Sequence, residues 1–176
     1  NILNAQRGLL RSNYELQDWA QVKTSATALL GNADISTDDQ IVANFYIGKA
    51  FQADNNCDSS LVAFQQVAKL TKSELGAEAR YNIARCYYLQ NDLKTAETAA
   101  IDVVTRTPSY DYWIASAYIL LGDINAKEKD YFNAKATLQS IVDNCKIPEL
   151  VSTAREKLDQ VTATEKSQSK IKDNKQ

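Results

Sequence analysis

Residues 77–108 read AEARYNIARCYYLQNDLKTAETAAIDVVTRTP. Within this stretch the polar pair Asn91-Asp92 separates two segments whose apolar residues recur at helical spacings of three and four. Such spacing places the apolar side chains on one face of an α-helix, and a polar pair between two such segments is typical of a tight turn. The stretch therefore predicts two helices, over 74–90 and 93–106, that pair as a helical hairpin.

The same pattern recurs along the whole chain. Polar pairs stand at Gln17-Asp18, Asn55-Asn56, Asn91-Asp92 and Lys129-Asp130, at spacings of 38, 36 and 38 residues. Before each pair, a large apolar residue precedes a mostly small one, as in Leu9-Leu10, Ile47-Gly48, Ile83-Ala84 and Leu121-Gly122. A fixed period of this length is the signature of stacked repeats, so the chain predicts four hairpins.

Small residues on both helices of a hairpin let the two helices approach closely. On the predicted first helices these are Gly48, Ala84 and Gly122, and on the second helices Ser60, Ala96 and Ala134. A bulky side chain at any of these positions would wedge the pair open. We therefore expect Ala96 and Ala134 to be almost fully buried between the paired helices.

The predicted fold class is all-α: an α-solenoid of about four helical hairpins plus a C-terminal capping helix. The remaining helices are expected over 2–15, 19–30, 38–54, 58–71, 110–128 and 131–144. Pro148 suits the first turn of a helix, and an apolar stripe from Leu150 to Val161 predicts the cap. The solenoid domain would span 1–163, with repeats about 3–36, 41–74, 77–110 and 115–147 and the cap over 148–163. Residues 164–176 are polar and Lys-rich, which predicts a frayed or disordered tail or a linker.

Composition supports helices and excludes most familiar active sites. The chain has only 5 glycines and 2 prolines among 176 residues, and no histidine. The absence of histidine removes Ser-His-Asp and Cys-His catalysis and histidine metal ligands. Asp38-Asp39 is expected in a loop where, with Thr37, it caps the third helix. No catalytic, cofactor-binding or metal motif is present, so we expect no enzyme activity.

The cysteines and the overall charge also predict no site chemistry. Cys57, Cys86 and Cys145 lie 29 and 59 residues apart, too far for zinc or redox motifs, so we expect free and mostly buried thiols. The net charge of -2 offers no pull toward nucleic acid. The longest apolar run, Tyr112 to Gly122, is about half the ~20 residues that a membrane-spanning helix needs.

In this repeat pattern the chain resembles the tetratricopeptide repeat family, whose unit is a helix-turn-helix of about 34 residues. The best copy keeps the family pattern at Ile83-Ala84, Tyr87, Asn91-Asp92, Ala96 and Pro108, and copy four keeps it at Tyr118, Leu121-Gly122, Asp130-Tyr131 and Ala134. Copies one and two are weaker, because Val22 fills a small position and Asn13 replaces an aromatic residue.

The resemblance implies a concave binding surface lined by the first helix of each hairpin. Cations of successive repeats would hold carboxylates of an extended acidic segment, while aromatic rings pack on its apolar side chains. The alternative is an ordinary solvated face with structural tyrosines. Two rows of residues are expected on this surface, one of Arg11, Lys49, Arg85 and Asp123 and the other of Arg7, Phe45, Tyr81 and Ile119, with Tyr14 and Tyr88 a turn further on. Arg11, Lys49 and Arg85 would form a ladder of cations. The candidate partner-binding residues are Arg7, Arg11, Tyr14, Phe45, Lys49, Tyr81, Arg85 and Tyr88.

Three functions remain open at this point. The first is a non-catalytic scaffold that binds an acidic protein or peptide segment. The second is a structural spacer that contacts further repeats on its N-terminal side, in which case Ile2 and Leu9 would lack their normal cover. The third is a helical accessory domain of an enzyme or sensor. The chain starts at Asn1 and contains no methionine, so we expect it to be a fragment of a larger protein.

Two stretches, GAEARYNIARCYYLQNDLKTAE and YWIASAYILLGDINAKEKDYFNAKATLQSIVDN, resemble bacterial tetratricopeptide proteins of the cell envelope. That resemblance favours the periplasm or cell envelope over the cytoplasm.

Overall fold

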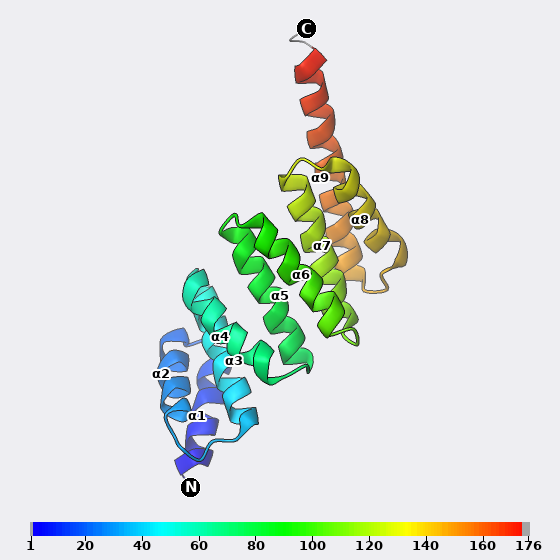
Figure 1. The fold of residues 1–176 in the computed structure, drawn as a ribbon. Helices are drawn as coiled ribbons and strands as arrows, with labels where there is room; N and C mark the ends of the chain where they lie inside the picture. Colours follow the sequence, from blue (N-terminus) through cyan, green and yellow to red (C-terminus); the bar gives the residue numbers. More distant parts are fainter. Residues whose placement is uncertain (1, 174–176) are drawn as a thin grey trace.

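The computed structural model describes residues 2–173, which form a stack of antiparallel helices without a strand (Figure 1). The first hairpins lie at the blue end of the stack, and the last helix projects beyond it at the red end. The predicted all-α solenoid is confirmed. The helices are α1 (Ile2–Glu15), α2 (Trp19–Leu30), α3 (Thr37–Ala53), α4 (Cys57–Leu70), α5 (Glu74–Leu89), α6 (Leu93–Arg106), α7 (Asp111–Lys127), α8 (Tyr131–Asn144) and α9 (Pro148–Asp173).

Each hairpin turn is built by one of the four polar pairs. The first residue of the pair takes a left-handed backbone conformation, with φ of 55° at Gln17, 55° at Asn55, 63° at Asn91 and 67° at Lys129. The second residue accepts a hydrogen bond on its side chain from the backbone N–H three residues further on, which caps the next helix. Its own N–H donates to the carbonyl five residues back, which closes the preceding helix. The pair thus ends one helix and starts the next.

The helices of a hairpin touch at the predicted small residues. Ala96 and Ala134 are fully buried, as expected, and so is Ser60. A Cβ placed on Gly48 would lie 2.7 Å from a ring carbon of Phe64, and one on Gly122 would lie 2.7 Å from Cγ of Leu138. The Ser60 hydroxyl also donates to the Gly48 carbonyl at 3.1 Å. In these two hairpins a large side chain of the second helix therefore fills the space that a glycine leaves on the first.

Neighbouring hairpins are closer together on one side of the stack than on the other. The first helices form a row in which each helix contacts the next, so that α1 contacts α3, α3 contacts α5, α5 contacts α7 and α7 contacts α9. Within residues 2–173, no two of α2, α4, α6 and α8 contact each other. The row of first helices is therefore the shorter, inner side of the stack, and we call its open surface the inner face.

The last helix, α9, takes the place of the first helix of a fifth hairpin. It packs on α8 and contacts α7, as α7 packs on α6 and contacts α5. Its Ala154 and Val161 are buried and continue the columns of Ala117 and Ile124 on α7. No second helix follows within the described residues, and an exposed Asp159 stands at the position that corresponds to Gly122.

The prediction of a frayed tail from Thr164 is wrong for residues 164–173, because α9 continues to Asp173. An ion pair between Lys135 of α8 and Glu165 ties the start of this extension to the stack. A polar helix needs no apolar stripe when it is the solvated continuation of a packed one. The remainder of the predicted tail, 174–176, lies outside the described residues.

Gly48→Ala is expected to lower the free energy of unfolding by about 1–3 kcal/mol, because the added methyl group overlaps the buried Phe64 ring. Urea denaturation measures the change. Gly8→Ala is the matched control, since a Cβ there meets nothing within 4 Å. Helix propensity alone should then stabilise this variant by up to about 1 kcal/mol. Equal stabilisation by both substitutions would contradict the close helix contact at Gly48.

Candidate functional site: the inner face

The two predicted rows of binding residues differ in exposure. The row of Arg11, Lys49, Arg85 and Asp123 is exposed or half-buried on the inner face. In the other row Phe45 and Ile119 are only 3% and 6% exposed. Phe45 packs edge-on against Phe64, with ring centroids 5.9 Å apart, and shares a core cluster with Ala79 of the next hairpin. The prediction that Phe45 offers its ring to a partner is therefore wrong, because neighbouring hairpins close over that position.

Ion pairs join successive first helices across the inner face. The pairs are Arg7 with Asp39 at 2.7 Å, Lys49 with Glu78 at 2.8 Å, and Lys157 with Asp123 at 2.8 Å. The partners in each pair lie about one repeat apart in sequence. Two of the predicted partner-binding cations, Arg7 and Lys49, are therefore already engaged between hairpins.

Asp39 is the most highly connected of these acids. Its carboxylate accepts two hydrogen bonds from the Arg7 guanidinium and one each from the N–H and hydroxyl of Ser36. Ser36 is the N-cap of α3, so Asp38 and Asp39 lie in the first helical turn and not in the expected loop. The Arg7 guanidinium, together with the Ser36 donors, holds the pKa of the Asp39 carboxyl well below its usual range.

Aromatic rings fill the space between the first helices. Tyr14 stacks on Tyr46 with ring centroids 3.7 Å apart and planes 5° from parallel. Burial raises the pKa of the Tyr14 phenol. At the other end of the inner face, the Lys127 ammonium lies 4.5 Å from the centroid of the Tyr88 ring. The predicted tyrosines are therefore half-buried, and each leaves only part of its ring for a partner.

Three predicted residues, Tyr81, Arg85 and Tyr88, meet in one cavity of about 290 Å³ on the inner face, which we call the inner cavity. Helix α5 supplies these three residues. The other walls come from α7 and α9, and include Tyr112, Ser116, Ile119 and Asp123, and Leu150, Thr153 and Lys157. Sequence reasoning missed the contribution of α9, since a capping helix was not expected to line the binding face.

The inner cavity carries one uncompensated positive charge. Lys157 donates to both carboxylate oxygens of Asp123, at 2.9 and 2.8 Å. Burial raises the pKa of the Asp123 carboxyl, and the Lys157 ammonium opposes that shift. Arg85 is exposed and makes no hydrogen bond or ion pair with any residue in the described part of the chain. Burial also raises the pKa of Tyr81, so its phenol is neutral near pH 7.

Arg11 does not line the inner cavity that contains Arg85. It lines a separate cavity of about 340 Å³ between α1 and α3, together with Arg7, Asp39 and Tyr46. Lys49, which stands between Arg11 and Arg85 in the row, is bound to Glu78. The predicted ladder of cations is therefore interrupted at Lys49, and Arg11 and Arg85 line separate cavities.

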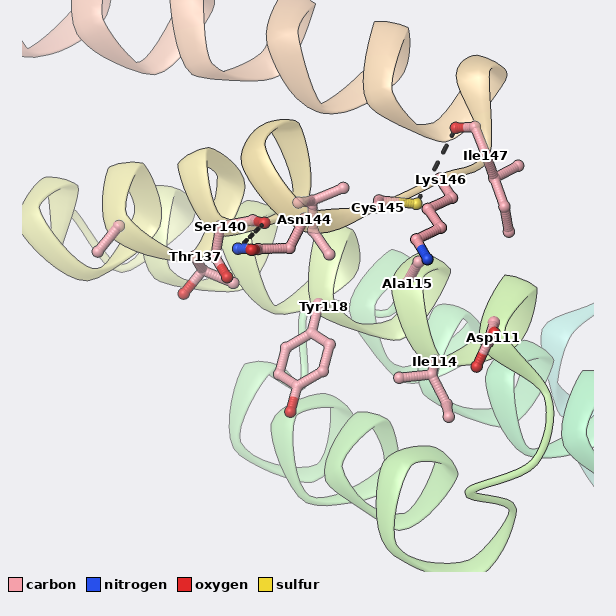
Figure 2. Close-up of a pocket in the computed structure, with 12 residues that line it drawn as sticks. Asp111, Ile114, Ala115, Tyr118, Thr137, Ser140, Asn144, Cys145, Lys146 and Ile147 are labelled. Atoms are coloured by element: carbon pink, nitrogen blue, oxygen red, sulfur yellow. Dashed lines mark hydrogen bonds between the residues drawn. The ribbon is translucent and has the colours of Figure 1, made fainter.

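A cavity larger than the inner cavity, of about 730 Å³, was not expected from the sequence. It lies on a different face of α7, against α8 and residues 145–147, and Figure 2 shows Tyr118 and Ile114 projecting from α7 into this region. Asn144 donates to the Ser140 carbonyl at 3.0 Å along its α8 wall. The only signal for it in the sequence is Tyr118, which the repeat pattern explains as a structural aromatic residue.

Across residues 2–173, no three His, Cys, Asp or Glu side chains are grouped so as to hold a metal ion. None of the helices in that range combines the length and the apolar character needed to cross a bilayer.

Asp39→Asn is expected to lower the melting temperature at pH 7, because it removes the charge that binds Arg7. The pKa of this carboxyl is lower in the folded protein than in the unfolded chain, where it is about 3.9. Its stabilising effect is therefore complete above that value and is lost as the pH falls further. Melting curves from pH 7 to pH 2 should show the two proteins converging in acid. Asp38→Asn, at an exposed position in the same turn, should match the wild type throughout. A constant gap at every pH would contradict an ionic role for Asp39.

A sequence model of the tetratricopeptide repeat family matches residues 78–109, which contain most of α5, the Asn91-Asp92 turn and all of α6. A search of curated proteins finds no match to the chain. Repeats of this family are typically non-catalytic interaction modules, so the match indicates a protein-interaction scaffold. The resemblance to cell-envelope proteins stays a prediction. Residues 78–109 are therefore similar to a tetratricopeptide repeat, and the all-α solenoid around them is consistent with that kind of repeat.

Proposed function

We propose that the chain binds an acidic segment of a partner protein at the inner cavity, without chemistry of its own. The observation that carries this proposal is Arg85, an exposed cation without a partner in the described residues, in a cavity walled by Tyr81, Tyr88 and Tyr112. A free guanidinium recognises a carboxylate through paired N–H donors. Neutral phenol rings beside it offer apolar surface together with hydroxyl groups.

The size and charge of the inner cavity define the ligand further. Ligand pockets usually begin near 300 Å³, so about 290 Å³ has room for one or two side chains of a longer segment. Asp123 and Lys157 neutralise each other there, and Arg85 remains as the net charge. The best fit is an Asp or Glu side chain next to an apolar one, with the rest of the segment lying along the inner face.

A structural spacer is the second candidate, and the exposed apolar residues of α1 favour it. Ile2, Leu9 and Leu16 are 74%, 56% and 75% exposed. The residues that correspond to Leu9 in later repeats, such as Ile47 and Ile83, are partly buried against the preceding hairpin. A further helical hairpin packed on α1 would cover Leu9 in the same way. The accessory-domain alternative has no observation that favours it.

Peptide arrays provide the test. The full chain is applied to extended peptides that pair Asp or Glu with apolar residues, and bound sequences are remeasured by fluorescence anisotropy. Arg85→Glu should weaken binding by about tenfold, because the substitution replaces one ionic contact with a repulsion. Raising the salt concentration should weaken wild-type binding, since exposed charges are screened.

The matched control is Arg155→Glu, which makes the same charge reversal at an exposed position on α9 outside the inner cavity. It should bind as the wild type does. Equal binding by both variants, or binding insensitive to salt, would leave Arg85 as a solvated cation and favour the structural spacer.

A further inference from the structure

Folding brings together two cysteines that are far apart in the sequence. Cys57 is the first residue of α4, and Cys86 lies near the end of α5 in the next hairpin. Both line one cavity of about 640 Å³, and the neighbouring Cys57 contributes to raising the pKa of the Cys86 thiol. Both cysteines are free thiols and form no disulfide within the described residues. The sequence spacing of 29 residues hides this pair because α4 and α5 pack directly on each other.

The surroundings hold the two thiols together and leave one of them reachable. Cys86 is only 1% exposed, whereas Cys57 is half-buried at the cavity wall. Beside them, Gln90 at the end of α5 donates to the Asp58 carboxylate of α4 at 2.7 Å, which fixes the same helix junction. Ser60, one turn beyond Cys57 on α4, is fully buried and donates to the Gly48 carbonyl. The junction is therefore firmly placed on both sides of the pair.

We propose that Cys57 and Cys86 are an oxidisable thiol pair, which low-molecular-weight disulfides convert into an intramolecular disulfide between the second and third hairpins. The proposal is independent of the inner cavity and of any partner. The shared cavity, the packing of α4 on α5 and the Gln90–Asp58 hydrogen bond place the two cysteines at one junction. A disulfide requires such proximity, so that the two side chains meet without a large backbone rearrangement.

The reaction proceeds by two thiol–disulfide exchanges. The Cys57 thiolate, at the N-terminus of a helix and open to the cavity, attacks one sulfur of the small disulfide and releases the first small thiolate. The Cys86 thiol then loses its proton to solvent and attacks the Cys57 sulfur, which releases the second small thiolate. The protein loses two hydrogen atoms and the small disulfide is reduced to two thiols. Burial, together with the neighbouring Cys57, raises the pKa of Cys86 to about 12, so the more exposed Cys57 is the first nucleophile.

The test uses the full chain and oxidised glutathione as the probe. After incubation, the wild type should lose the mass of two hydrogen atoms and retain one reactive thiol when denatured. Peptide mapping without reductant should identify a Cys57–Cys86 bridge. Titration against glutathione redox buffers should give an equilibrium constant for the bridge at least about tenfold greater in the folded protein than in urea.

Three substitutions separate the possible results. Cys145→Ser, at a half-buried cysteine outside this cavity, should leave the bridge unchanged. Cys86→Ser should trap Cys57 as a mixed disulfide with glutathione, and Cys57→Ser should abolish the bridge. Three free thiols after exhaustive oxidation, a bridge through Cys145, or a wild type that stops at the mixed disulfide would each overturn the proposal. Equal equilibrium constants in buffer and in urea would do so as well.

Discussion

The close approach of two helices at a glycine or an alanine sets the geometry of this molecule. Where Gly48 meets Phe64, and where Gly122 meets Leu138, the side chain of the second helix packs directly on the first-helix backbone because the glycine has no Cβ. Steric contact of that kind holds the hairpin at one spacing. Because each second helix packs on the following first helix, the spacing is passed from hairpin to hairpin. The inner face, with its ion pairs and cavities, is a product of that repetition.

Much of this fold could be predicted because its determinants are local in sequence. Asn91 and Asp92 end one helix and cap the next through bonds to residues at most five positions away. A repeated local signal of that kind is visible without any knowledge of tertiary structure. The end of α9 was missed for the opposite reason. Its extension is held partly by Glu165 through Lys135, which lies 30 residues earlier.

The candidate site was harder to predict, since it depends on how one hairpin is rotated against the next. Arg7 and Phe45 occupy equivalent positions in successive repeats, yet Arg7 forms an ion pair with Asp39 while Phe45 is buried. Lys49 and Arg85 occupy a second equivalent position in successive repeats. Among the described residues Lys49 pairs with Glu78 of the following first helix, whereas Arg85 has no such acidic partner. Whether the residue at such a position is exposed, forms an ion pair or is buried depends on side chains about one repeat away. The proximity of Cys57 and Cys86 could not be predicted from the sequence for the same reason, since it depends on how α4 packs on α5.

The contacts between hairpins have a mechanical consequence. Within residues 2–173 each helix contacts only its own hairpin and the adjoining ones, so nothing ties one end of the stack to the other. When the two ends are pulled apart, the extension is divided among the junctions, and each junction needs to rotate only slightly. We expect such a molecule to lengthen and recoil like a spring before any helix unravels. A scaffold of this kind can follow the movement of what it holds while keeping every hairpin folded.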